Sequence, residues 1–187
     1  MISAGEAARG VYGAWRLAHG DRSGLAYFDA TYQGFWRSFG AAIVALPAYI
    51  GLVIVSMADY EGEINWGGVF LVEGIAYVID WFAFPLAAVY LCRWVGREAN
   101  YFLFIVALNW AKVIMAAVML PAAIVASLAQ GTVFAIVPVA IFAAVLVYVW
   151  HVTRVSLAVG TAEAIMMTLA NLGLGVVVSL WARSLLF

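Results

Sequence analysis

Residues 102–128 read FLFIVALNWAKVIMAAVMLPAAIVASL, a run in which Lys112 is the only charged side chain. At a helical rise of about 1.5 Å per residue, roughly 20 apolar residues cross the hydrocarbon core of a bilayer. A run of this length and composition predicts a transmembrane helix, which places the chain among the integral membrane proteins.

Four further runs of similar length predict an all-α integral membrane protein with five spans. The chain is 67% hydrophobic and 10% charged, whereas soluble domains contain roughly 45–50% apolar and 25% charged residues. The connections between the runs are too short to hold a soluble domain. The predicted transmembrane domain covers residues 39–187, and its spans are 39–57, 67–91, 102–128, 133–151 and 162–181.

Several classes of function find no support in the composition. A net charge of −1 without a basic run argues against a nucleic-acid partner. The single cysteine, Cys92, excludes an intrachain disulfide and a site with several cysteine ligands. No metal-ligand spacing, phosphate-binding glycine loop or nucleophile elbow occurs. The sequence therefore predicts a non-enzymatic protein with no metal and no cofactor, and leaves a bound lipid open.

The distribution of arginine predicts the orientation of the spans. With five spans, seven arginines fall on one side of the membrane and only Arg183 on the other, together with the acidic turn 59–63. Because cytoplasmic segments are enriched in Lys and Arg, we expect a cytoplasmic N-terminus and an external C-terminus, in a bacterial inner membrane. The seven arginines are Arg9, Arg16, Arg22, Arg37, Arg93, Arg97 and Arg154.

The segment before the first span, residues 1–38, contains a predicted amphipathic helix over Ser3 to His19. Ser3 and Glu6 have the spacing of a capping box at its start. One face carries Ala4, Ala8, Val11, Trp15 and Ala18, as in a helix lying in the headgroup layer; a helix docked on the cytoplasmic loops has the same periodicity. Aromatic residues of this segment are predicted interfacial anchors, namely Trp15, Tyr27, Phe28 and Trp36.

A shift of 74 residues aligns two stretches without a gap and indicates an internal duplication. It places Tyr27, Phe28, Trp36 and Pro47 on Tyr101, Phe102, Trp110 and Pro121. Spans one and three would then be equivalent helices of two parallel hairpins, with span five as an addition. Pro47 and Pro121 each remove a backbone hydrogen bond, so both helices are expected to kink at the same depth. Residues 29–35 are polar enough for an interfacial helix, whereas their counterpart, 103–109, is apolar enough to be buried.

Polar residues inside spans two and three predict a mid-membrane cluster. Asp80 and Lys112 lie at the same depth on consecutive antiparallel helices, about 16 Å from their shared turn by helical rise, which predicts an ion pair. Asn109, and Asn171 of span five, are expected as hydrogen-bonding neighbours, with Glu73 nearer the external face. The pair is either a functional polar site or a device that fixes the register of two helices.

Small residues with helix-packing spacing lie at the end of the chain, at Ser156, Gly160 and Ala164 and at Gly173 and Gly175. They fit internal packing or docking of spans four and five onto other membrane subunits or a second copy. Five spans with a cytoplasmic N-terminus resemble the topology of Yip1-like membrane proteins, which implies a role in membrane organisation. The leading hypothesis is a structural or accessory subunit of a membrane assembly; the alternative is a small transporter or channel built around Asp80, Lys112 and Asn109.

Overall fold

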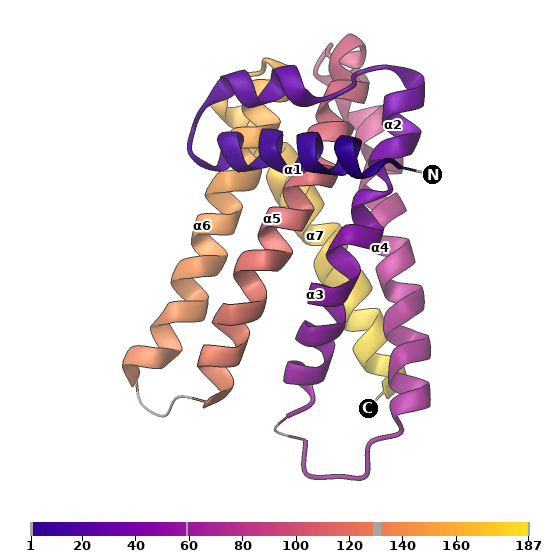
Figure 1. Cartoon of the computed structure of the whole chain (residues 1–187), viewed down its shortest axis with the longest axis vertical. Helices are drawn as coiled ribbons and strands as arrows, with labels where there is room; N and C mark the ends of the chain where they lie inside the picture. The colour runs from indigo at the N-terminus through magenta and orange to yellow at the C-terminus, as the bar shows by residue number, and fades with distance from the viewer. Residues whose placement is uncertain (1, 59, 129–131, 187) are drawn as a thin grey trace.

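The computed structural model describes residues 2–58, 60–128 and 132–186, except for the side chains of residues 132–135. Five helical segments are long and apolar enough to cross a membrane, as expected for an all-α membrane protein. They run side by side along the long axis of the molecule, while the N-terminal helix α1 lies across one end of the bundle (Figure 1). The bounds of the five segments are α2 (Tyr32–Ser38) with α3 (Ala41–Ser56), α4 (Trp66–Trp94), α5 (Tyr101–Leu128), α6 (Thr132–Leu157) and α7 (Thr161–Leu186).

Two ends differ from the predicted spans by more than five residues: the first segment begins at Tyr32 rather than 39, and α6 continues past residue 151 to Leu157. Beyond His151 the sequence is more polar, with Thr153, Arg154 and Ser156. Thr153 and Ser156 are nevertheless buried, and the Ser156 hydroxyl donates to the Val152 carbonyl within the helix, at 2.6 Å. Because a hydroxyl can be satisfied by its own helix, these residues do not end the apolar packing.

The arginines of the N-terminal segment and of two turns gather at one end of the bundle, called here the arginine end. The 3₁₀-helices η1 (Arg22–Tyr27) and η2 (Glu98–Asn100) and the turn between α6 and α7 lie there (Figure 1). The opposite end holds the turn after α3 and the end of α7. Asp59, Gln130 and Gly131, which the sequence assigned to turns at this end, lie outside the described residues. The two chain termini are therefore at different ends, as an odd number of spans requires.

Helix α5 is the centre of the fold. It packs against α1, α2, α3 and α6, while α4 packs mainly along α7. Residues 104–111 of α5 are all buried, so a full two turns of this helix touch only protein. Helices α3 and α4 stand further apart and meet through large side chains, such as the neighbouring rings of Tyr49 and Tyr77.

The predicted duplication is only partly reflected in the packing. Most of the equivalent of residues 29–35 is buried in α5, whereas residues 32–38 form the separate helix α2. That residues 29–35 form an interfacial helix stays a prediction. The two predicted hairpins differ, because α5 packs closely along α6 while α3 and α4 are held apart. Pro47 and Pro121 both lie inside helices, and a kink at each stays a prediction.

Helix α1 (Ala4–Ala18) begins with the predicted capping box, since both the Ser3 and the Glu6 hydrogen bonds are present. Its buried face consists of Gly10, Gly13, Ala14 and Leu17, which is not the face predicted to be apolar. Gly10 lies directly on the Trp110 ring, where a Cβ atom would be 2.2 Å from Cε2. The missing side chain therefore lets α1 lie against the flank of α5, about 13 Å from the start of that helix by helical rise.

The predicted apolar face of α1 points away from the protein. Ala4, Ala8 and Ala18 are exposed, and Trp15 is 53% exposed. The helix therefore docks on a span rather than on the loops between spans. Its outer face remains apolar enough to contact the headgroup layer.

Candidate functional site

The candidate site is the charged pair halfway along α4 and α5. Lys112 Nζ donates to Asp80 Oδ2 at 2.8 Å and to the Asp80 backbone carbonyl at 3.1 Å. The ammonium also lies 4.8 Å from the centre of the Trp81 ring, a cation–π distance. The contact predicted from helical depth is thus present, and three separate groups hold the Lys112 ammonium.

The two charged side chains differ in burial. Lys112 is 14% exposed, whereas 43% of the Asp80 side chain is exposed. Asp80 nevertheless lies on the inward face of α4, because Ala76 and Phe84, one turn to either side, are buried. On α7, a Cβ atom at Gly175 would be only 3.6 Å from Asp80 Oδ1. The carboxylate thus faces other helices and still has free space around it.

A second carboxylate lies on the same face of α4, two turns towards the opposite end. The Tyr49 hydroxyl of α3 donates to Glu73 Oε2 at 2.6 Å. Between Glu73 and Asp80, Tyr77 packs its ring 4.4 Å from that of Tyr49 and donates to the Ala42 carbonyl at 2.7 Å. Glu73 therefore joins α3 to α4 rather than joining the turn beyond residue 58.

Asn109 does not take the predicted place beside the ion pair. It is 1% exposed, and its amide donates to the Ser38 hydroxyl at 2.9 Å. Asn109 is three residues before Lys112, so it lies about one turn nearer the arginine end, where α2 ends. The reason is the docking of α2 on α5, which brings a hydroxyl within reach of the amide.

Asn171 and the small residues of α7 also differ from their predicted roles. Within the described residues Asn171 makes no hydrogen bond, so it is not a partner of Asp80 or Lys112. Ser156 and Ala164 are buried within the chain, which favours internal packing for this part of the stripe. Gly173 is exposed with nothing near its Cβ position, unlike Gly175.

The four predicted anchors divide into two pairs. Trp15 and Trp36 are 53% and 51% exposed at the arginine end and can contact headgroups. Phe28 is 8% exposed because it packs under Gly13 of α1, so the prediction of an anchor is wrong for this residue. Tyr27 is half-buried, and its hydroxyl accepts from Arg16 at 3.3 Å.

Sequence reasoning missed Trp81, which contacts Lys112, and three residues beside the other polar groups, namely Ser38, Tyr49 and Tyr77. These residue types are common as interfacial or packing residues in membrane helices, and nothing in their spacing assigns them to a site. Only Tyr77 carried a usable signal, since it is three residues before Asp80 and four after Glu73 and so shares their face.

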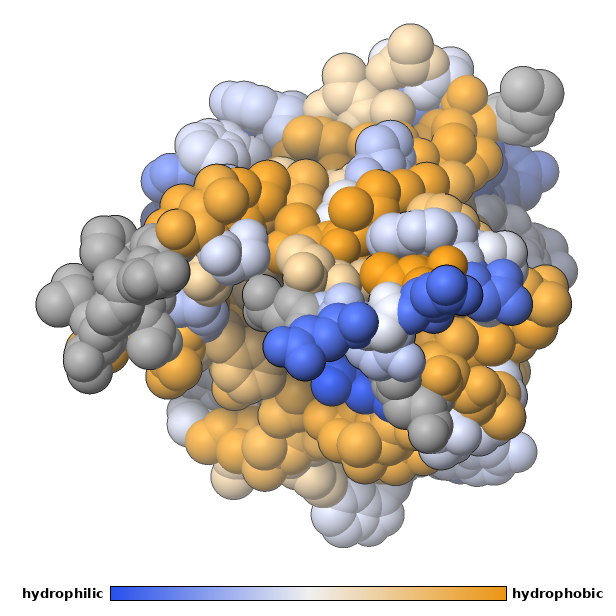
Figure 2. All heavy atoms as spheres, turned by 90° about the horizontal axis from the view of Figure 1, so that it is seen from below, coloured by the Kyte–Doolittle hydropathy of each residue, from blue (hydrophilic) through white to orange (hydrophobic). Residues whose placement is uncertain are grey.

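Polar side chains therefore follow one another through the depth of the bundle. From the opposite end they are Glu73 with Tyr49, then Tyr77, then Asp80 with Lys112, then Asn109 with Ser38. The surface of the opposite end is itself mostly apolar, with hydrophilic side chains in a few patches (Figure 2). No group of three or more metal-ligating side chains is found among the described residues. Such a series can bind or pass a proton or a small polar solute.

Comparison with known proteins adds no identification. No protein-family model matches the chain, and no curated protein or solved structure matches it significantly.

Proposed function

We propose that this chain is a small membrane transporter or channel in which Asp80 and Lys112 form a proton-linked site at mid-membrane. The observation that carries the proposal is the 43% exposure of an Asp80 side chain that faces its own bundle. A carboxylate at this depth is costly in lipid and usually faces protein or a water-filled space. Water that reaches Asp80 between α4, α5 and α7 would solvate the carboxylate without a partner protein.

The chemistry of the pair supports a proton-linked step. While Asp80 is ionised, it holds the Lys112 ammonium, and protonation of the carboxylate removes that attraction. The ammonium then keeps the Asp80 carbonyl and the Trp81 ring as its partners, at 3.1 and 4.8 Å. Lys112 can thus shift between two states that differ by one proton on Asp80.

The direction of access follows from the neighbouring polar groups. Glu73, Tyr49 and Tyr77 lie between Asp80 and the opposite end, whereas the route to the arginine end passes through the buried Asn109. By the enrichment of arginine in cytoplasmic segments, the arginine end faces the cytoplasm in this proposal. Access to Asp80 in this state is then from the external side of a bacterial inner membrane.

Thiol labelling tests whether water reaches the pair. Gly175→Cys, in a Cys92→Ala background, puts a thiol beside Asp80, where a Cβ atom has ordinary contact distances. The matched control is Gly173→Cys, on the same helix, at an exposed position with nothing within 4 Å of its Cβ. We expect a membrane-impermeant thiosulfonate, added externally to sealed vesicles, to label Cys at 175 at least tenfold faster than at 173. Equal, slow labelling of both would overturn the proposal.

A flux measurement tests transport itself. Proteoliposomes with the full chain and an internal pH dye are expected to dissipate a pH gradient faster than empty liposomes. Asp80→Asn should remove the difference, while Glu61→Gln, in the exposed turn, should not. If the wild-type chain conducts no faster than Asp80→Asn, the proton-linked site is wrong.

The accessory-subunit hypothesis stays a prediction and makes the contrary forecast. A partner helix covering Asp80 would protect Cys at 175 from labelling in native membranes and expose it after purification. These experiments do not test three further expectations, which stay predictions: the absence of enzyme activity, the absence of a cofactor and the Yip1-like topology.

A further inference from the structure

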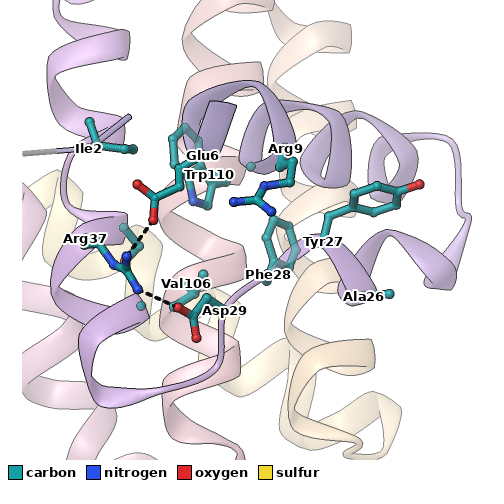
Figure 3. A pocket seen from close by; sticks show the side chains of 13 residues that line it. Ile2, Glu6, Arg9, Ala26, Tyr27, Phe28, Asp29, Arg37, Val106 and Trp110 are labelled. Carbon is teal, nitrogen blue, oxygen red and sulfur yellow. Dashed lines mark hydrogen bonds and ion pairs between the residues drawn. The ribbon is translucent and has the colours of Figure 1, made fainter. Parts of the chain in front are cut away.

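A separate cavity of about 370 Å³ lies at the arginine end, between α1, α2, α5 and the segment after η1. Its wall combines charged side chains with apolar ones, and Figure 3 shows them converging from these elements. Those used below are Glu6, Arg9, Asp29, Arg37, Ser38 and Trp110. Neither Asp80 nor Lys112 lines the cavity, although Trp110 is only two residues before Lys112 on α5.

The acceptors in this wall are already occupied. Arg37 bridges the two carboxylates, at 2.8 Å from Glu6 Oε1 and 2.9 Å from Asp29 Oδ2. The remaining oxygen of Glu6 accepts from Ser3, and that of Asp29 accepts from the Thr31 amide. Hydrogen bonds from the Ser3 amide to Glu6, and from the Thr31 hydroxyl and amide to Asp29, lower the pKa of both carboxyl groups. An amine or a metal ion would have to compete with these contacts for the carboxylate oxygens.

Two donors in the wall are unoccupied. Trp110 is 4% exposed, and in the part of the chain that the structure describes its indole N–H donates to nothing. The Arg9 guanidinium makes no ion pair or hydrogen bond within the same residues. Figure 3 shows the two side chains on the same side of the cavity. Arg9 is exposed, and the Trp110 N–H is not among the buried polar atoms without a partner, so both donors are open to an acceptor that enters the cavity.

We propose that this cavity binds the phosphate group of a membrane phospholipid, with Arg9 and the Trp110 indole N–H as its donors. A phosphodiester supplies several charged acceptor oxygens and suits a guanidinium. The position identifies lipid as the source. Trp15 and Trp36, half-exposed at the same end, are typical of the headgroup layer. Ile2 and Val106 give the cavity an apolar part for the start of an acyl chain.

The test uses the purified full chain in mild detergent, with native mass spectrometry and thermal unfolding as readouts. Phosphatidylglycerol is the lipid probe, diacylglycerol the probe without phosphate, and inorganic phosphate the soluble probe. We expect one phosphatidylglycerol to be retained per chain and to raise the unfolding temperature, with no effect of the other two. An equal effect of diacylglycerol would overturn phosphate recognition, and an equal effect of millimolar inorganic phosphate would overturn lipid as the source.

Variants locate the binding site. Arg9→Gln is expected to weaken phosphatidylglycerol binding tenfold or more, because one charge-assisted hydrogen bond is lost. The matched control is Arg97→Gln, which removes the same charge from an exposed turn at the same end and should change affinity less than twofold. Trp110→Phe keeps an aromatic ring but removes the N–H together with the rest of the five-membered ring, so it should weaken binding several-fold. Equal losses in Arg9→Gln and Arg97→Gln would show general electrostatic attraction and overturn the site.

Discussion

Removing one partner of the Asp80–Lys112 pair should destabilise the protein more than removing both. Lys112→Met leaves a carboxylate at mid-membrane, and Asp80→Asn leaves an ammonium that is only 14% exposed. Breaking a fully buried pair costs about 3–5 kcal/mol, and a lone charge at the bilayer centre about 2.5–3.5 kcal/mol. Since 43% of the Asp80 side chain is exposed, we expect about 2 kcal/mol for each single change.

The double variant Asp80→Asn with Lys112→Met carries no unpaired charge and should lose about 1 kcal/mol or less. The coupling energy of the cycle is then about 3 kcal/mol in favour of the pair. The assay is reversible unfolding in mixed micelles by increasing dodecyl sulfate, followed by tryptophan fluorescence at neutral pH. Additive losses, with the double variant near 4 kcal/mol, would refute a direct interaction. Single changes below 0.5 kcal/mol would show that the pair behaves as a solvated surface contact.

Two further predictions concern the N-terminal segment. Gly10→Val places a side chain where Cβ would be 2.2 Å from Trp110, so α1 should lose about 1–3 kcal/mol of docking energy and become cleavable by trypsin. Gly5→Val is the control, because nothing lies within 4 Å of its Cβ position, and this variant should stay protected from trypsin. Cleavage of both variants would show that a change in helix propensity, rather than lost docking, exposes α1. Hydrogen bonds from the Ser23 hydroxyl and amide lower the pKa of Asp21 to about 2. Because the folded-state pKa is depressed, this stabilisation is present above the usual pKa near 3.8 and is lost as the pH falls towards 2. Amide exchange of residues 16–25 should therefore accelerate, after correction for intrinsic rates, between pH 4 and pH 2, and Asp21→Asn should remove that dependence; an unchanged profile in Asp21→Asn would contradict it.

The spans could be predicted because length and hydropathy are properties of the sequence alone. A helix in lipid satisfies its backbone within itself, so an apolar run of sufficient length has few other structures available. The Asp80–Lys112 contact could be predicted for a related reason. Antiparallel helices joined by a short turn share a depth scale, and counting residues from the turn at 93–100 gives both positions.

Contacts between segments far apart in sequence could not be predicted in this way. Asn109 bonds to Ser38 because α2 docks on α5, and no counting from a shared turn relates these two helices. The buried face of α1 was missed for a different reason. Gly10 and Gly13 have no side chain and add little hydropathy, so a search for apolar periodicity overlooks a face that packs by close approach.

The Ser38 hydroxyl connects the two sites proposed for this protein. It lines the cavity at the arginine end and also accepts the hydrogen bond from Asn109, one turn from Lys112 on α5. A lipid phosphate held beside Ser38 would stabilise the docked arrangement of α1 and α2 on α5. That arrangement buries Asn109 and closes the route from Asp80 to the arginine end. A phospholipid that binds the docked form more tightly than the undocked form would then favour access to Asp80 from the opposite end. The shift in the equilibrium between the two forms is limited by the difference between these two affinities.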